Sequence, residues 1–238
     1  MKIAIMQPYF FPYIGYWQLI NAVDKYVIYD DGLFRPRGWI NRNRILINNQ
    51  SYYITIPLHQ TISQEIRNMP IINNYDFRRK MKRDIFYAYK KAPCFERAMG
   101  VIEPIIDYDT DNCSDYIVNS IYKICDYLKI TTSIEVSSRI DKERNKGAIG
   151  VILSVCKYFG ADCYVNAIGG MGLYNKESFH DVGIELKFLS TEEIQYRQFG
   201  KEFHPNLSII DVMMFNTKEE IIGMLSKYEL IGPGGKET

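Results

Sequence analysis

The first twenty residues constrain the fold of this chain more than any other stretch. Residues 3–6 (Ile-Ala-Ile-Met) are an apolar run that fits a buried strand. Pro8 ends this strand, because proline cannot donate a hydrogen bond to a sheet. Pro12 fixes a second bend, and apolar side chains then recur at helical spacing, at Tyr16, Leu19, Ile20 and Val23. The stretch therefore predicts a strand, a rigid aromatic loop and a helix.

The aromatic loop lies where open α/β sheets bind ligands. Such ligands sit beyond the carboxyl ends of the strands, often against the N-terminus of a helix. The loop residues that we predict to contact a substrate are Gln7, Tyr9, Phe10 and Tyr13. Packing of Phe10, Phe11 and Tyr13 into the core is an equally weighted alternative.

A second strand is predicted over residues 25–29, and it ends in Asp30-Asp31-Gly32. One helix would join it to the first strand, which is the βαβ pattern of a parallel sheet. Carboxylates at the end of such a strand can hold a ligand or take up a proton, but Asp-Asp-Gly is also a turn sequence. We predict a turn role for Asp31 and a catalytic role for Asp30, with no metal site.

The densest polar run of the chain, residues 35–44, follows this turn. In an extended strand, Asn41 and Asn43 would lie on one face and Arg42 and Arg44 on the other. Arginine binds phosphate through two parallel hydrogen bonds, so the two arginines could hold a diphosphate beside Trp39. All five side chains are predicted to bind substrate. The alternative is an edge strand whose charges face water.

Two further features supply candidate site residues. Residues 44–47 and 51–57 predict a hairpin across Asn48-Asn49, and His59, just beyond it, is either a general base or a surface loop residue. Later in the chain, Gly169 and Gly170 follow a predicted strand over residues 162–168. Glycines allow backbone amides to approach an anion, so we place both in the site.

The remaining chain predicts helices over residues 76–91, 111–128, 146–159 and 217–228, and strands over residues 130–136 and 184–188. The helix at residues 76–91 is rich in Lys and Arg, as a nucleic-acid or lipid surface would be, but the acidic stretch at residues 103–115 favours a solvated, charge-paired face. Ser208 with Asp211 three residues later fits a helix capping box. A single domain over residues 1–230 and a flexible tail over residues 231–238 are expected.

Composition excludes several classes of protein. The 238 residues carry a net charge of +1, with 47% hydrophobic and 24% charged residues, which is ordinary for a globular protein and argues against nucleic-acid binding. No apolar run approaches the roughly 18 residues of a membrane span, so we expect a cytoplasmic protein without membrane insertion. Five cysteines without a Cys-x-x-Cys pair favour neither a disulfide framework nor a zinc site. The composition indicates no particular cofactor.

Three motifs carry a resemblance to a known family. Residues 7–15 (Gln-Pro-Tyr-Phe-Phe-Pro-Tyr-Ile-Gly), residues 29–31 (Tyr-Asp-Asp) and residues 37–45 (Arg-Gly-Trp-Ile-Asn-Arg-Asn-Arg-Ile) resemble the WbqC-like family, and the likeness extends to about residue 228. That family is encoded in bacterial clusters for O-antigen and other surface polysaccharides, and some members are described as glycine transferases. The layout of strands also resembles nucleotidylyltransferases, although their His-x-x-His signature is absent. The expected fold is a three-layer α/β sandwich with a mainly parallel, Rossmann-like sheet, a small β-hairpin and a helical insertion.

The resemblance implies a transferase that joins an acyl or aminoacyl group to a nucleotide-linked amino sugar during lipopolysaccharide biosynthesis. Its expected partners are the nucleotide sugar and the acyl or aminoacyl donor. In this hypothesis Arg42 and Arg44 hold the diphosphate, and Asp30 or His59 removes a proton from the attacking amine. Two alternatives stay open: an ATP-dependent ligase or nucleotidylyltransferase of the same pathway, and a non-catalytic binding protein of the assembly machinery.

Overall fold

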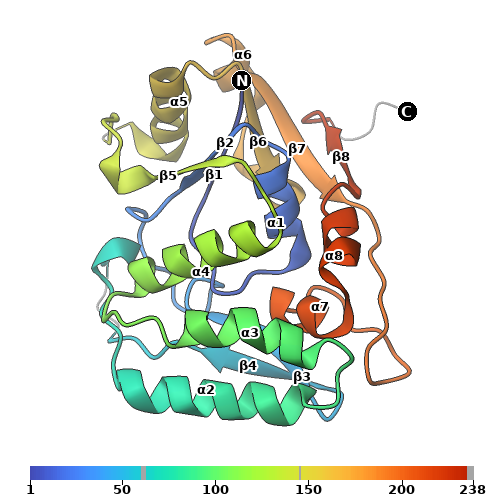
Figure 1. The fold of residues 1–238 in the computed structure, drawn as a ribbon. Coiled ribbons are helices and arrows are strands. Elements are labelled where there is room, and N and C mark those ends of the chain that lie inside the picture. The colour runs from blue at the N-terminus through green and yellow to red at the C-terminus, as the bar shows by residue number, and fades with distance from the viewer. Residues whose placement is uncertain (60–62, 145, 235–238) are drawn as a thin grey trace.

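The protein is an α/β sandwich built on one mainly parallel sheet (Figure 1). A computed structural model describes residues 1–59, 63–144 and 146–234. Within them the sheet contains β1 (Lys2–Met6), β2 (Lys25–Ile28), β5 (Ser133–Val136), β6 (Cys163–Ala167), β7 (Glu185–Thr191) and β8 (Tyr228–Ile231). The spatial order is β5-β2-β1-β6-β7-β8, and only β8 runs antiparallel to its neighbour. The direction of the winding reverses between β1 and β6, which is the topological switch point of such sheets.

Helices cover both faces of the sheet, which confirms the predicted fold class. Ile3 and Ile5 of β1 share an apolar cluster with Val155 and Cys156, which belong to α5 (Gly147–Phe159). The intervening Ala4 belongs to the other cluster, with α1 (Ile14–Asn21) and α4 (Cys113–Tyr127). This alternation follows from the two-residue period of a strand. The short helix α6 (Lys176–His180) completes the α5 side.

A hairpin and a group of helices lie beyond the carboxyl edge of the sheet, in the lower half of Figure 1. The strands β3 (Arg42–Ile47) and β4 (Gln50–Thr55) pair antiparallel around the turn at Asn48-Asn49. The helices are α2 (Asn74–Tyr89), α3 (Phe95–Ile106), α7 (Ile209–Phe215) and α8 (Lys218–Met224), and 3-10 turns occupy Ile66–Asn68, Ser137–Arg139 and Ile168–Leu173.

The predicted elements are present, with differences at the C-terminus. The last helix ends at Met224 rather than residue 228, and β8 follows it. The predicted domain boundary at residue 230 falls inside β8, where Ile231 pairs with Phe188. Residues 235–238 of the expected tail lie outside the described residues. Among the residues that are described, no helix combines the length and apolar character needed to cross a membrane.

Candidate functional site

The β1–α1 loop is held in place through its main-chain carbonyl groups. The Gln7 carbonyl accepts a hydrogen bond from the Tyr16 hydroxyl (3.0 Å), and the Pro12 carbonyl accepts one from the Trp17 indole (3.1 Å). Phe10 is fully buried, and its ring packs against Phe11 and Tyr116. The structure therefore places Phe10 in the core, while Tyr9 and Tyr13 stay partly exposed.

Strand β3 presents its side chains as the alternation predicted. Asn41 and Asn43 are buried, whereas Arg42 and Arg44 are partly exposed. Asn43 Nδ2 donates to the carbonyls of Phe10 and Phe11, both at 3.0 Å, so β3 is fastened to the aromatic loop. Asn41 Nδ2 donates to the Ile56 carbonyl, so it joins the two ends of the β3–β4 hairpin.

The aromatic loop and the arginine-asparagine strand converge on one cavity of about 450 Å³. This switch-point cavity is also lined by residues just after β6, the neighbour of β1, and at the end of β7, the next strand. Its volume is within the range of small-molecule sites. The lining residues are Tyr9, Pro12, Tyr13, Trp39, Asn43, Arg44, Ile168, Gly169, Ser190, Thr191 and Asn206.

Arg44 is the cationic group of this cavity. Its guanidinium forms no ion pair within the described residues, and its buried Nε has no hydrogen-bond partner there. The guanidinium carbon lies 5.4 Å from the centre of the Trp39 ring, and one terminal nitrogen is 3.4 Å from the Asn206 carbonyl. Since an unpaired buried N–H is costly, the position favours an anionic ligand.

Arg42 has a different environment, although it shares a face of β3 with Arg44. Its Nε donates to the Gly38 carbonyl (3.1 Å), a second nitrogen donates to the Arg37 carbonyl, and the group lies 4.6 Å from the Tyr53 ring centre. Arg42 therefore stabilises the loop before β3 and is not part of the cavity lining.

The N-terminus of α1 borders the same cavity. Its N-cap residue, Tyr13, makes no side-chain capping hydrogen bond. The Tyr16 N–H donates to the Tyr13 carbonyl (3.1 Å), so the N–H groups of Ile14 and Gly15 are the first-turn donors that an anion could use. A Cβ on Gly15 would lie 2.4 Å from Tyr13 Cε2 and 2.9 Å from Thr191 Oγ1. Glycine is thus required for the tyrosine ring to close on the helix. Burial raises the pKa of the Tyr9 and Tyr13 hydroxyls, which therefore remain neutral hydrogen-bond donors.

The two aspartates after β2 form a separate polar group. Asp30 is buried, and its two carboxylate oxygens accept hydrogen bonds from the N–H (2.8 Å) and the hydroxyl (2.6 Å) of Ser138. Asp31 pairs with Lys142 at 2.6 Å and with Arg144 at 3.0 Å. Burial acts to raise the pKa of Asp31, but the hydrogen bond and charge of Lys142, together with the Ser137 hydroxyl and the charge of Arg144, hold that pKa below its usual value.

Several predicted site residues lie outside the cavity lining. Asp30 is one, and His59 is exposed, with its N–H 3.4 Å from the Pro70 carbonyl. Gln7 Nε2 lies 3.5 Å from the Leu33 carbonyl, and Gly170 faces the amide of Asn166, whereas Gly169 does line the cavity. The catalytic roles of Asp30 and His59 stay predictions.

Sequence reasoning missed part of the lining. Ser190 and Thr191 stand at the end of β7, and Asn206 lies just before α7, in a segment that the sequence predicted only as the start of a helix. The available signal was positional, since a polar pair at the carboxyl end of a parallel strand is typical of a site. Among the thiols, burial raises the pKa of Cys113, Cys125 and Cys156 to about 12, which disfavours the nucleophilic thiolate.

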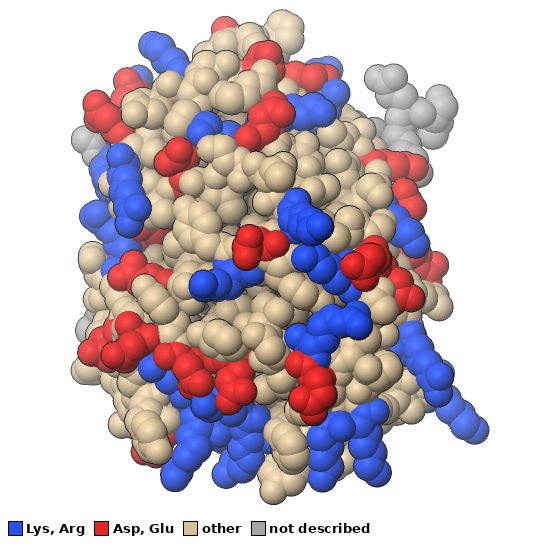
Figure 2. Space-filling model, viewed as in Figure 1, with Lys and Arg blue, Asp and Glu red and all other residues tan. Residues whose placement is uncertain are grey.

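The basic helix α2 is largely neutralised by neighbouring acids. Figure 2 shows Lys and Arg side chains along the lower edge of the molecule, with acidic side chains directly above them. Lys82 pairs with Glu103 (3.5 Å) and Asp107 (2.8 Å), and Arg78 pairs with Asp109 (3.5 Å). These pairs fit the charge-paired surface that we favoured from the sequence.

Fold and cavity together define an α/β protein with a cavity at the switch point of a Rossmann-like sheet. The sequence profile of the WbqC-like protein family matches residues 7–222, so the chain belongs to that family. It is also 28% identical over 223 residues to an uncharacterized protein of Mycobacterium tuberculosis, covering 92% of this chain and 95% of that protein. No solved structure matches the chain.

Proposed function

We propose that the switch-point cavity binds a nucleotide-linked amino sugar and that the protein transfers an acyl or aminoacyl group to its amine. The observation that carries the proposal is Arg44, whose guanidinium has no ion-pair partner among the described residues and lies in an aromatic-walled cavity beside the N-terminus of α1. A diphosphate matches both the guanidinium fork and the free N–H groups. The rings of Tyr9, Tyr13 and Trp39 would then contact the base or the sugar.

In the proposed reaction, the amine nitrogen attacks the carbonyl carbon of an activated donor. A C–N bond forms, the bond from the acyl carbon to the donor's leaving group breaks, and the amine releases one proton. The neutral hydroxyls of Tyr9 and Tyr13 can donate hydrogen bonds to the oxygen that gains negative charge. Among the described residues the cavity lining includes no carboxylate or histidine, so positioning of the amine carries most of the catalysis proposed here.

Product mass tests this proposal. The protein is incubated with a panel of nucleotide-linked amino sugars and activated acyl and aminoacyl donors, and the products are weighed by mass spectrometry. We expect a sugar that carries one acyl group in place of one amine hydrogen, and a large loss of product with Arg44→Gln. Arg79→Gln is the matched control, because Arg79 is an exposed arginine on α2. Absence of acylated product across the panel would reject the transferase.

The strand order favours a second candidate, an ATP-dependent ligase or nucleotidylyltransferase. Sheets with this order bind nucleotides at the switch point, between the first strand and its neighbour on the other side. The same cavity would then hold ATP. Release of pyrophosphate on addition of ATP and magnesium separates this candidate from the transferase, and absence of ATP binding by calorimetry removes it.

A further inference from the structure

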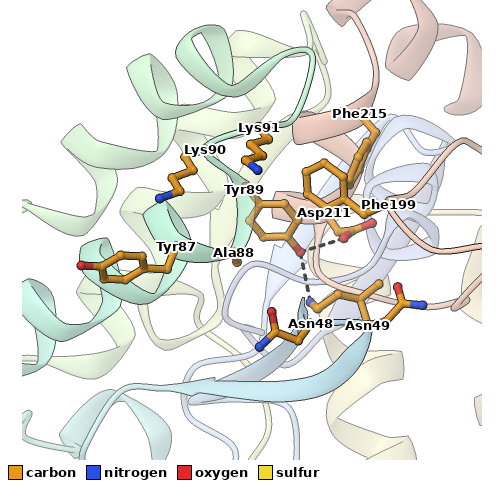
Figure 3. A pocket seen from close by; sticks show the side chains of 11 residues that line it. Asn48, Asn49, Tyr87, Ala88, Tyr89, Lys90, Lys91, Phe199, Asp211 and Phe215 are labelled. Atoms are coloured by element: carbon orange, nitrogen blue, oxygen red, sulfur yellow. Dashed lines mark hydrogen bonds between the residues drawn. The ribbon is translucent and has the colours of Figure 1, made fainter.

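A second cavity, of about 340 Å³, lies between the β3–β4 turn, the end of α2 and α7 (Figure 3). It shares no lining residue with the switch-point cavity, and none of the site residues predicted from the sequence lines it. The two cavities are nevertheless neighbours in the fold, because β3 contributes Arg44 to one and Leu46 to the other.

Two lysines give this cavity a positive side. Lys90 and Lys91 follow the last residue of α2, and Figure 3 shows them on the opposite side from Asn48 and Asn49. Lys91 forms no ion pair or hydrogen bond within the described residues. Lys90 lies over the ring of Tyr87, 5.4 Å from its centre. Its ammonium also lies 5.6 Å from the centre of the Phe86 ring. Both lysines therefore repel a cation, and the Lys91 ammonium has no protein partner among the described residues to compete with an anion.

The opposite side offers polar groups that also lack protein partners. Asn48 and Asn49 form the hairpin turn with φ of 50° and 62°, and their side-chain amides make no hydrogen bond within the part of the chain described here. The Asn49 amide lies over Gly200, where an added Cβ would be 2.1 Å from its Nδ2. The amides thus have both donors and acceptors free for a ligand.

The wall between these two sides is aromatic. Phe199 and Phe215 meet edge to face with ring centres 4.8 Å apart, and Phe199 is 54% exposed. Behind them the fully buried Asp211 accepts hydrogen bonds from the hydroxyls of Tyr89 (2.7 Å) and Tyr196 (2.8 Å). Because Asp211 is inaccessible and already bonded, it shapes the wall and does not serve as a counter-ion for a ligand.

We propose that this cavity is a second ligand site, for an anionic monosaccharide: a hydroxylated ring that bears a phosphate or a carboxylate. Lys90 and Lys91 meet the anionic group, Asn48 and Asn49 meet hydroxyls, and the exposed ring of Phe199 contacts the apolar face of the sugar. A purely apolar ligand would leave the amides unpaired, and a neutral sugar would leave the lysines without a counter-ion.

Calorimetry on the Arg44→Gln variant tests the site, since this background disables the switch-point cavity. Glucose 1-phosphate and glucuronate are titrated beside glucose and inorganic phosphate, each at two salt concentrations. We expect saturable, salt-sensitive binding of at least one anionic sugar, at least about fivefold tighter than glucose or phosphate alone. Tighter binding of glucose 1-phosphate identifies phosphate as the anionic group, and tighter binding of glucuronate identifies carboxylate.

Lys91→Gln should weaken this binding at least about fivefold, because it removes one charge-assisted contact. Lys157→Gln is the control, an exposed lysine in the last turn of α5. The proposal fails if neither anionic sugar binds, if phosphate alone binds as tightly, or if both lysine variants behave alike. If the sugars bind the wild type but not Arg44→Gln, they occupy the switch-point cavity, so the second site is rejected while the proposed function stands.

Discussion

Ser208 Oγ donates a 2.8 Å hydrogen bond to the main-chain carbonyl of Phe11, a residue 197 positions earlier in the chain. The carbonyl oxygen of Phe11 also accepts a 3.0 Å hydrogen bond from Asn43 Nδ2. Phe11 has φ of 41°, a left-handed conformation that a bulky residue keeps only when its surroundings impose it. Strand β3, α7 and the aromatic loop are thus joined at one oxygen, and the wall of the switch-point cavity depends on that junction.

Removal of either donor should loosen the loop. We expect Asn43→Ala to lower the free energy of unfolding by about 1–3 kcal/mol, because the Phe10 carbonyl loses a buried partner. Ser208→Ala should cost about 1 kcal/mol, and the double variant should deviate from additivity, because both donors act on Phe11. Equilibrium unfolding in urea measures all three. Ser226→Ala, an exposed serine that donates to a carbonyl, should change stability by less than about 0.5 kcal/mol.

Gly15→Ala should separate binding from stability. Alanine favours the helix by up to about 1 kcal/mol, but its Cβ would collide with the Tyr13 ring and displace it from the cavity wall. We therefore expect weaker binding of a nucleotide sugar by calorimetry, with a melting temperature close to that of the wild type. Gly100→Ala in α3 meets nothing within 4 Å, so it should raise stability and leave binding unchanged. Equal binding by both variants would show that the ring is not part of the site.

Strands β1, β2 and β6 were predictable because each is a short, largely apolar run followed within two residues by proline, aspartate or glycine. Helix α3 was not, since Gly100 and Pro104 within it lower helix propensity, and it is the burial of Ile102 and Ile105 that holds it. Strand β8 was not predicted, because its four residues are too few to show the alternation of apolar and polar side chains that marks a strand. It forms by pairing with β7.

The location of the site could be predicted from the sequence, but the contacts of its individual side chains could not. The aromatic loop could be placed at the carboxyl edge of the sheet from the strand pattern. Its contact with β3, and the difference between Arg42 and Arg44, depend on hydrogen bonds to distant carbonyl groups. Asp211 illustrates the same limit. Ser208 does cap α7 by accepting from the Ile210 N–H (3.2 Å), but the predicted capping box is wrong, because Asp211 binds Tyr89 and Tyr196 instead.

The buried Asp31–Lys142 pair should govern stability in acid. The pKa of Asp31 is held below its unfolded value, so its contribution is complete above about pH 4 and is lost as the pH falls through the lower, folded pKa. Lys142→Met leaves a buried carboxylate with only Arg144 as its ion-pair partner. We expect the free energy of unfolding to fall by about 3 kcal/mol at pH 7 and to depend less on pH below about pH 4.

Urea unfolding at a series of pH values between 7 and 3 measures this effect. Lys146→Met is the matched control, because Lys146 pairs with Glu143 at the same 2.6 Å distance but on the surface. It should cost less than about 1 kcal/mol. Equal losses in the two variants would mean that burial adds nothing to the Asp31 pair.

Asp30→Asn decides between a catalytic and a positioning role for Asp30. Both carboxylate oxygens already accept hydrogen bonds from Ser138. In Asp30→Asn the side-chain NH₂ replaces one of these oxygens, so two hydrogen-bond donors would face each other. We expect a loss of about 1–3 kcal/mol in stability and a less than tenfold change in kcat/KM in the acylation assay. Ser138→Ala removes one of the two bonds without touching the carboxylate, and it should reduce stability less and keep turnover. If Asp30→Asn instead abolishes turnover while stability and substrate affinity are kept, Asp30 acts in the chemical step, as expected of the base predicted from the sequence, because the variant has then lost an interaction made only in the transition state.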